Sequence, residues 1–425
     1  MNKRVNLLAA ALLTVLASPP SANPGPAPAG QTDLVRAALD YSAGPESRCA
    51  ALERLGELSS AEASEAVVAA VSDPDPAVQA CAARAAGASR NQEAVNALLT
   101  NVGVYLAGSS AKGPYEDDLR ARLKAIDSIW ALGEIGSPSV MAKLREFYSA
   151  ADAVLRVNLA ISVGKLGPNP HSVPYLRSIA ASAAEAGAVR AAAFEMLEER
   201  GETAAVPGLA ASAPGIEPGD LVYTGGIVGS VGSFGTSDLP IGHAGIFLGT
   251  EVRNNRLYVL IADCVPDNFE PYGGVRNIDS WKNFTHHFKF PYYGNRTTRR
   301  APTQAQRQAI VRLARDMGGR GLTYSDSHFT QKGPDAFDCV GYTEFVYEQA
   351  GLNPTDNSYE TGWGWPLTPW EQFEATASNA ARGAAFLPPF KNGAGQARTE
   401  ALLERGLFGT SAETPAVEVS SPSVN

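Results

Sequence analysis

The feature that most constrains the fold is an alanine-rich helical pattern that recurs along the first half of the 425-residue chain. Successive copies end at Gly56, Gly87, Gly133, Gly164 and Glu198, with steps of 31, 46, 31 and 34 residues. A step near 31–34 residues is typical of a helical solenoid, in which similar helical units stack on one another. Residues 33–210 are therefore predicted to form a helical repeat domain. The long second step predicts an insertion around residues 103–117.

These copies resemble short HEAT repeats, with an ordinary alanine-rich helical bundle as the alternative. Cys49 and Cys81 occupy nearly equivalent positions in neighbouring copies. Stacked helices lie roughly 8–10 Å apart, whereas a disulfide requires Cα atoms within about 7 Å. We therefore expect the two cysteines to be packed as small buried side chains and not bridged. The region lacks clustered histidines or paired acids, so we expect it to act as a scaffold or to bind a protein partner.

The N-terminus resembles a secretory signal peptide over residues 1–22, with a short membrane anchor as the alternative. Basic residues precede the apolar run Leu7–Leu16, and small residues follow it. A transmembrane helix needs about 20 apolar residues, so this run is too short to span a bilayer. Residues 23–32 are expected to be a linker, and residues 391–425 a mostly disordered tail. We expect a periplasmic or secreted protein of the bacterial cell envelope. The net charge of −9 argues against a nucleic-acid partner.

Residues 216–390 predict a second, mixed α/β domain, because alanine becomes rarer and aromatic and β-branched residues more frequent. The predicted strands are residues 220–223, 243–248, 257–262 and 286–291. The predicted helices are residues 304–317, opened by a capping box of Thr303 and Gln306, and residues 339–350.

Cys339 is the candidate nucleophile of this domain. It follows Asp338, a good N-cap residue, at the first turn of a predicted helix. Backbone N–H groups and the helix dipole favour a thiolate at such a position, and a thiolate is the nucleophile of cysteine hydrolases. A buried structural cysteine is the alternative.

His243 is the candidate general base, and it precedes Cys339 by 96 residues. It stands on a predicted strand, whose rigid backbone suits a base. Asp263 ends the next predicted strand, from which its carboxylate can hold the imidazole in the correct tautomer. His328 is a rival base. Cys264 adjoins Asp263 and is a possible disulfide partner of Cys339, although neighbouring strand residues face opposite sides.

These residues resemble the NlpC/P60 superfamily of papain-like cysteine hydrolases in two motifs. One is Tyr324 followed by residues 337–341, Phe-Asp-Cys-Val-Gly, where Val340 replaces the usual serine. The other is Gly219-Asp220 followed by residues 243–249, His-Ala-Gly-Ile-Phe-Leu-Gly. The histidine motif comes first, as in the circularly permuted branch that includes YiiX-like and lecithin:retinol acyltransferase-like proteins. The resemblance implies an α-solenoid followed by an α+β permuted papain-like domain with an antiparallel sheet.

By this resemblance Cys339 is the nucleophile, His243 the base and Asp263 the residue that orients it, with no cofactor or metal. The backbone N–H of Cys339 and Tyr324 are expected at the oxyanion, and Asp338 and Trp365 on the substrate side. Trp365 belongs to an aromatic segment that lines a groove or packs a loop. His286 and His287 are adjacent, so on a strand they cannot share a metal, and we interpret them as structural or rim residues.

The expected activity is that of an exported cysteine hydrolase acting through a thioester intermediate. Its expected substrates are peptidoglycan stem peptides or lipid acyl groups. The alternative is a catalytically inactive papain-like domain that acts with the solenoid as an envelope binding or scaffold protein, which Val340 slightly favours.

Overall fold

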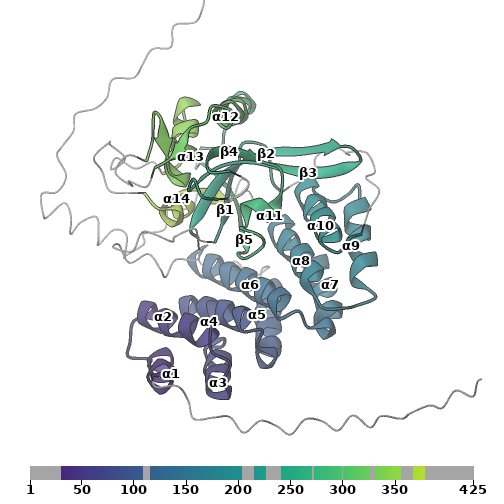
Figure 1. Cartoon of the computed structure of the whole chain (residues 1–425), viewed down its shortest axis with the longest axis vertical. Coiled ribbons are helices and arrows are strands. Elements are labelled where there is room, and N and C mark those ends of the chain that lie inside the picture. Colours follow the sequence, from purple (N-terminus) through teal and green to yellow (C-terminus); the bar gives the residue numbers. More distant parts are fainter. Residues whose placement is uncertain are drawn as a thin grey trace, which may run out of the picture.

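The structure is a computed structural model, and it describes residues 30–108, 115–202, 215–225, 241–269, 272–298, 300–325, 331–355 and 367–378 (Figure 1). The expected signal peptide, most of the expected linker and the expected tail lie outside the described residues. A helical repeat region is followed by a region with an antiparallel sheet. Within the described residues, no helix is both long and apolar enough to cross a membrane.

The first ten α-helices form consecutive pairs whose even-numbered members stack along the repeat region (Figure 1). Helix α5 has 14 residues and α6 has 21, and their length accounts for the long second step of the repeat. The predicted insertion at 103–117 therefore includes the end of α5 and the start of α6; residues 109–114 are not described. The helices are α1 (Gln31–Leu39), α2 (Pro45–Gly56), α3 (Ala61–Ala70), α4 (Pro76–Ala88), α5 (Val95–Gly108), α6 (Tyr115–Ile135), α7 (Met141–Ala150), α8 (Ala153–Lys165), α9 (Ser172–Ala181) and α10 (Gly187–Glu199).

The repeated glycines explain how these helices stack so closely. A Cβ atom on Gly56 would lie 3.0 Å from Cα of Ala85 in the next even-numbered helix. A Cβ atom on Gly133 would lie 2.8 Å from Cα of Ser162, and one on Gly164 would lie 2.5 Å from Cβ of Met196. Such distances are too short for two packed atoms, so the helices can stack this closely only because glycine has no Cβ atom.

Cys49 and Cys81 form a disulfide, so the expectation of two packed thiols is wrong. Their Cα atoms are 5.3 Å apart, well inside the typical range for a disulfide. The prediction used a generic spacing for stacked helices. Small residues instead let α2 and α4 approach more closely, as Gly56 against Ala85 shows.

The C-terminal region contains a six-stranded sheet of order β4-β3-β2-β1-β5-β8, in which every pair is antiparallel. Three predicted strands are confirmed as β1, β2 and β3, and both predicted helices as α12 and α13. A parallel pair, β6 with β7, precedes α13. The strands are β1 (Leu221–Thr224), β2 (His243–Arg253), β3 (Arg256–Val265), β4 (Gly274–Ile278), β5 (Tyr292–Thr297), β6 (Thr323–Tyr324), β7 (Ala336–Phe337) and β8 (Ala377–Ser378), and the helices are α11 (Trp281–Phe284), α12 (Gln304–Met317), α13 (Cys339–Gln349) and α14 (Pro369–Ala375).

The predicted strand at 286–291 is wrong. Ser280 caps the short helix α11 by accepting a hydrogen bond from Asn283 N at 3.0 Å. The next residues, His286, His287 and Phe288, form a left-handed turn with φ of 50°, 60° and 59°. The strand of this region, β5, starts only at Tyr292. Aromatic residues favour strands, but here they are packed around a turn.

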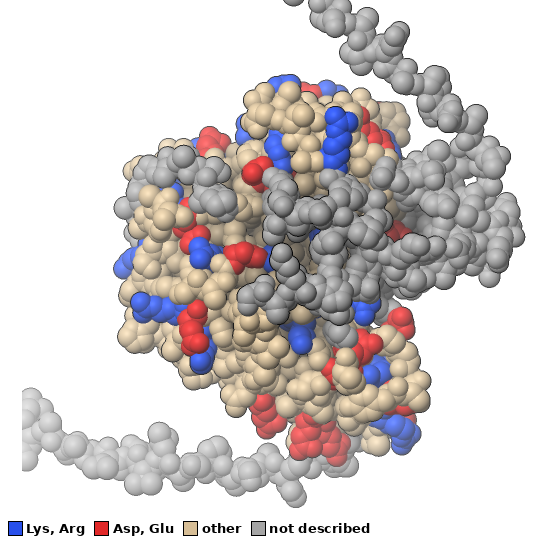
Figure 2. All heavy atoms as spheres, turned by 180° about the vertical axis from the view of Figure 1, so that it is seen from behind, with Lys and Arg blue, Asp and Glu red and all other residues tan. Residues whose placement is uncertain are grey.

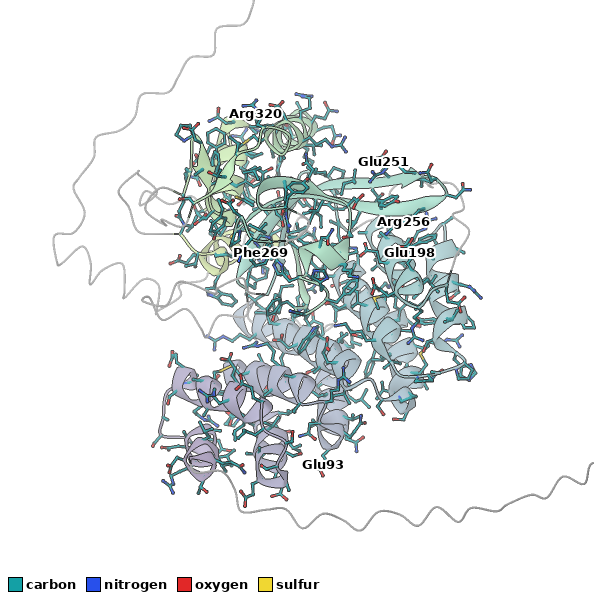
Figure 3. The ribbon with its side chains drawn as sticks, viewed as in Figure 1. Glu93, Glu198, Glu251, Arg256, Phe269 and Arg320 are labelled. Carbon is teal, nitrogen blue, oxygen red and sulfur yellow. A yellow bond between two sulfur atoms is a disulfide. The ribbon has the colours of Figure 1, made fainter. Side chains whose placement is uncertain are left out.

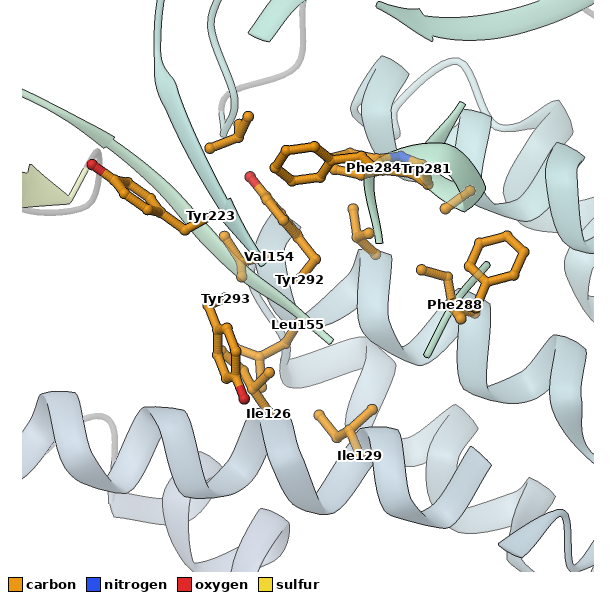
Figure 4. Close-up of a cluster of buried hydrophobic side chains, with 14 of the residues drawn as sticks. Ile126, Ile129, Val154, Leu155, Tyr223, Trp281, Phe284, Phe288, Tyr292 and Tyr293 are labelled. Carbon is orange, nitrogen blue, oxygen red and sulfur yellow. The ribbon is translucent and has the colours of Figure 1, made fainter. Parts of the chain in front are cut away.

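The helical repeats and the sheet share one hydrophobic core. Figure 4 shows Ile126, Ile129 and Leu155 from α6 and α8 in the same buried cluster as aromatic residues of the C-terminal region. Polar contacts cross the same boundary. The Asn158 side chain on α8 donates to Tyr292 O at 2.7 Å and accepts from Tyr292 N at 3.0 Å. The two regions are therefore joined by a buried interface.

The interface continues along α10. Glu195, which is 5% exposed, accepts hydrogen bonds from Trp281 N at 2.8 Å and Lys282 N at 2.9 Å, and so caps α11 from the repeat side. Farther out, Arg256 of β3 pairs with Glu198 of α10 at 2.6 Å (Figure 3). The last helix of the repeats, α10, thus contacts both the sheet and the segment after β4.

Candidate active site

The register of the sheet brings His243, Asp263 and Arg276 together on one face. Asp263 of β3 lies opposite Gly245 of β2 and opposite Arg276 of β4. His243 stands two residues before Gly245, so it shares that face and reaches Asp263 diagonally. His243 Nε2 and Asp263 Oδ2 are 2.9 Å apart, and Arg276 Nε is 2.7 Å from Asp263 Oδ1. All three side chains are fully buried.

The charge of this cluster defines the tautomer of His243. Burial opposes ionisation of Asp263, but Arg276 and the hydrogen bond from His243 outweigh it and hold the pKa of that carboxyl well below its usual range. An ionised carboxylate only accepts hydrogen bonds, so His243 Nε2 carries the proton. Nδ1 of His243 is buried and has no hydrogen-bond partner among the described residues. The Asp263 contact therefore orients the ring and leaves Nδ1 unengaged by the described residues.

Cys339 is the first residue of α13 and lies near Ala244, the residue that follows His243. Asp338 caps the helix, its Oδ1 accepting from Gly341 N at 2.7 Å, as the sequence predicts. Helix α13 packs against β2 and β3. The backbone N–H groups of Ala244, the residue after His243, and of Val340 lie close enough to the sulfur to lower its pKa. The start of α13 therefore lies near the start of β2, with the Cys339 sulfur close to the residue that follows His243.

The Cys339 thiol is neutral in this arrangement. Burial raises its pKa above the ordinary value and the Asp338 charge adds to this, whereas the amides of Ala244 and Val340 lower it. The amides of Ala244 on β2 and of Val340 at the helix start thus oppose the effect of burial without overcoming it.

Two aromatic rings enclose His243. The ring centroids of Phe284 and His286 lie 5.4 Å and 5.5 Å from that of His243. His286 is buried, and its Nε2 has no partner among the described residues. Burial and the neighbouring His243 lower the pKa of His286 to about 3, so it stays uncharged at neutral pH. His287, its neighbour, is exposed.

Of the other residues predicted at the site, Tyr324 and Asp338 lie within the described part of the chain. Tyr324 lies on β6, where it pairs with Phe337 just before the Asp338-Cys339 turn. Asp338 is engaged by Gly341 and by Gln331, whose Nε2 donates to its second oxygen at 2.5 Å, so it supports the helix start. Trp365 and His328 lie outside the described residues.

Cys264 and Cys339 are both free thiols, so no disulfide joins them. Cys264 Sγ donates to Phe337 O at 3.0 Å, and burial raises the pKa of its thiol well above the ordinary value. Asp263 engages His243 while its neighbour Cys264 contacts β7, as expected for adjacent residues on a strand.

Sequence reasoning missed Arg276 and the role of His286. Arg276 stands on β4, a five-residue strand that no pattern indicated. A buried arginine requires an acidic partner, but nothing in the sequence connects Arg276 with Asp263. His286 was placed on a strand that does not exist.

The described residues contain no group of three or more His, Cys, Asp or Glu side chains that could hold a metal ion. On the described part of the face in Figure 2, acidic and basic side chains are interspersed over most of the surface.

A family model described as HEAT repeats matches residues 32–103, which comprise α2 to α4, nearly all of α1 and most of α5. The N-terminal helices thus have the sequence character of HEAT repeats. No curated protein matches the chain. HEAT repeats commonly mediate protein interactions, which is consistent with a protein partner.

Proposed function

We propose that this protein is an exported cysteine hydrolase with a permuted papain-like domain of the NlpC/P60 superfamily. The observation that carries the proposal is the orientation of His243: Asp263 engages Nε2 and leaves Nδ1 without a partner among the described residues. The amide of the next residue, Ala244, lies near the Cys339 sulfur. The proposed base lies on β2, the orienting carboxylate on β3 and the nucleophile on α13. The histidine therefore precedes the cysteine along the chain, as expected for the permuted branch.

In the proposed reaction, His243 Nδ1 takes the thiol proton as Cys339 sulfur attacks the substrate carbonyl. The backbone N–H of Cys339 is the proposed oxyanion donor. The tetrahedral intermediate expels an amine or alcohol, which receives the proton from His243, and leaves a thioester. Water then gives a proton to Nδ1 and attacks the thioester, releasing the acid and returning the proton to sulfur. Asp263 stabilises the imidazolium in both steps, and Arg276 keeps Asp263 ionised.

The proposed substrates are amide bonds of cell-wall peptides or acyl bonds of lipids. The Cys49–Cys81 disulfide supports export, because such bonds persist in oxidising compartments. It agrees with the leader-like first 22 residues, and the proposed location is the periplasm or the cell exterior.

A catalytically inactive binding protein is the second candidate. Two observations favour it: Val340 replaces the serine usual in the family, and burial raises the pKa of the Cys339 thiol. In this case the papain-like domain and the repeats would together bind an envelope component.

The test is hydrolysis of purified muropeptides, phospholipids and p-nitrophenyl acetate by the full chain. Cys339→Ala and His243→Ala should each abolish turnover of whichever substrate is cleaved, with loss of at least about 100-fold. The matched control is Cys264→Ser, a second buried free thiol whose replacement still donates to Phe337 O. Turnover that survives in Cys339→Ala excludes the cysteine mechanism, and no turnover with any substrate favours the binding protein.

A further inference from the structure

The left-handed turn at residues 286–288 is the most unusual backbone feature near the proposed site. Non-glycine residues rarely adopt positive φ, and a run of three is exceptional. The other described non-glycine residues with positive φ are Arg90, Asn254 and Asn255, and the asparagines belong to the turn between β2 and β3. Such a conformation persists only when the surrounding structure determines it, and it is most frequent at functional sites.

The helical repeats hold this turn. The carbonyl oxygen of Phe288 accepts hydrogen bonds from Lys165 Nζ at 2.6 Å and from Trp130 Nε1 at 3.3 Å. Lys165 is also paired with Glu134 of α6 and lies over the Trp130 ring. The Phe288 side chain is 5% exposed, and Figure 4 shows it in the cluster shared by the repeats and the sheet.

The same turn reaches the proposed base from its other side. Its first residue, His286, packs on His243, and its ring also contacts Phe269 at 5.2 Å and Phe290 at 6.0 Å. His286 is buried while His287 points to solvent. A continuous chain of contacts therefore runs from Trp130 and Lys165 to the His243 imidazole.

We propose that the helical repeats are a structural part of the reaction site. Through Trp130 and Lys165 they hold the turn, and the turn keeps the ring of His286 against His243, which fixes the imidazole with its Nδ1 free. His286 is then a positioning residue. The inference rests on the proposed role of His243 as base, and it gives the repeats a task inside this chain in addition to any partner.

The test is nitrogen NMR of the full chain labelled with ¹⁵N-histidine. The chain has five histidines, and His243→Ala identifies the signals of His243. Among the described residues, Asp263, Arg276 and His286 are titratable or charged groups around that ring, and the Cys339 thiol lies near Ala244. The wild type should show one set of His243 signals, with a proton on Nε2, because that nitrogen faces Asp263. Lys165→Met, Trp130→Phe and His286→Ala should lose the separate Nε2 signal of His243, because the ring then exchanges between orientations.

Two controls separate positioning from general loosening. Arg156 on α8 is matched to Lys165: it pairs with Glu185, lies over Tyr148 and donates to Tyr148 O, contacts that all lie within the repeats. Arg156→Met should keep the wild-type signals, and His286→Phe should keep them because the ring remains.

The outcomes test the positioning role of the turn separately from the role of His243 as base. Unchanged His243 signals in Lys165→Met and His286→Ala would overturn the inference. Equal loss of the His243 signals in His286→Phe and His286→Ala would also overturn the inference. The nitrogen atoms of His286, and not the packing of its ring on His243, would then be what matters. A wild type whose His243 carries its proton on Nδ1 alone would instead contradict the proposed base, whatever the variants show.

Discussion

Glu195 should make the stability of this protein fall as pH rises through neutrality. Its carboxyl is 5% exposed and caps α11 across the interface. Burial raises its pKa from the ordinary 4.5 to about 8, against the opposing hydrogen bonds from Trp281 N and Lys282 N. The folded state therefore holds a proton that the unfolded chain has released. This stabilisation is fully present below pH 4.5 and is lost as pH rises through about 8.

The effect of Glu195 on the free energy of unfolding is best isolated between pH 6.5 and 8, where the other shifted groups contribute little. Asp127, raised to about 6 by burial, acts mainly below this window, and His286, lowered to about 3, contributes an opposite slope that ends near pH 6.5. One retained proton changes the free energy of unfolding by about 1.4 kcal/mol per pH unit. Because Glu195 is half ionised at pH 8, the expected loss across the window is about 1.5–2 kcal/mol.

The assay is urea unfolding of the full chain at several pH values, followed by tryptophan fluorescence, since Trp130 and Trp281 lie at the interface. Glu195→Gln should flatten the dependence between pH 6.5 and 8. Glu199→Gln, which removes an exposed carboxylate one helical turn away, should retain the wild-type slope. A wild-type stability that is constant or rises across the window, or an unchanged slope in Glu195→Gln, would refute the reasoning.

Two further predictions concern the helical repeats. Gly133→Ala should lower the free energy of unfolding by about 1–3 kcal/mol, because its Cβ atom would lie 2.8 Å from Ser162. The Cβ atom of Gly103→Ala would meet only Phe147, at 3.8 Å. Since alanine favours a helix more than glycine does, this variant should raise the free energy of unfolding by up to about 1 kcal/mol in the same urea assay. Removing the Cys49–Cys81 disulfide by the double alanine variant should cost about 3–4 kcal/mol for a sequence separation of 32 residues. Thermal unfolding should then be insensitive to reductant in the variant and sensitive in the wild type, and equal melting temperatures under oxidising conditions would contradict the estimate.

The parts of the fold that the sequence predicts are those with short-range causes. The repeat step is visible because each glycine meets the next stacked helix at the same position, as Gly133 does with Ser162. The capping box at Thr303 and the cap at Asp338 are formed by neighbours three residues apart. Cys339 and His243 could be singled out because each has a local motif.

The contacts of the proposed site depend on the sheet register, which local sequence patterns do not determine. The 2.9 Å contact between His243 and Asp263 was a hypothesis from strand order, and the sheet register places the two side chains together. Arg276 has no local signal, since its partner is fixed only once β4 pairs with β3. The disulfide was predicted incorrectly because generic helix spacing replaced the actual approach of α2 and α4.

By itself the sequence determined the order of the two regions, the helical repeats and the residues that could carry cysteine chemistry, because these follow from periodicity, caps and composition along the chain. Only the tertiary structure decided how the regions join. The contact of Trp130 with Phe288 spans 158 residues, and it holds three residues in a backbone conformation that their own propensities disfavour. Long-range packing can override local preference in this way, and no short stretch of sequence records it.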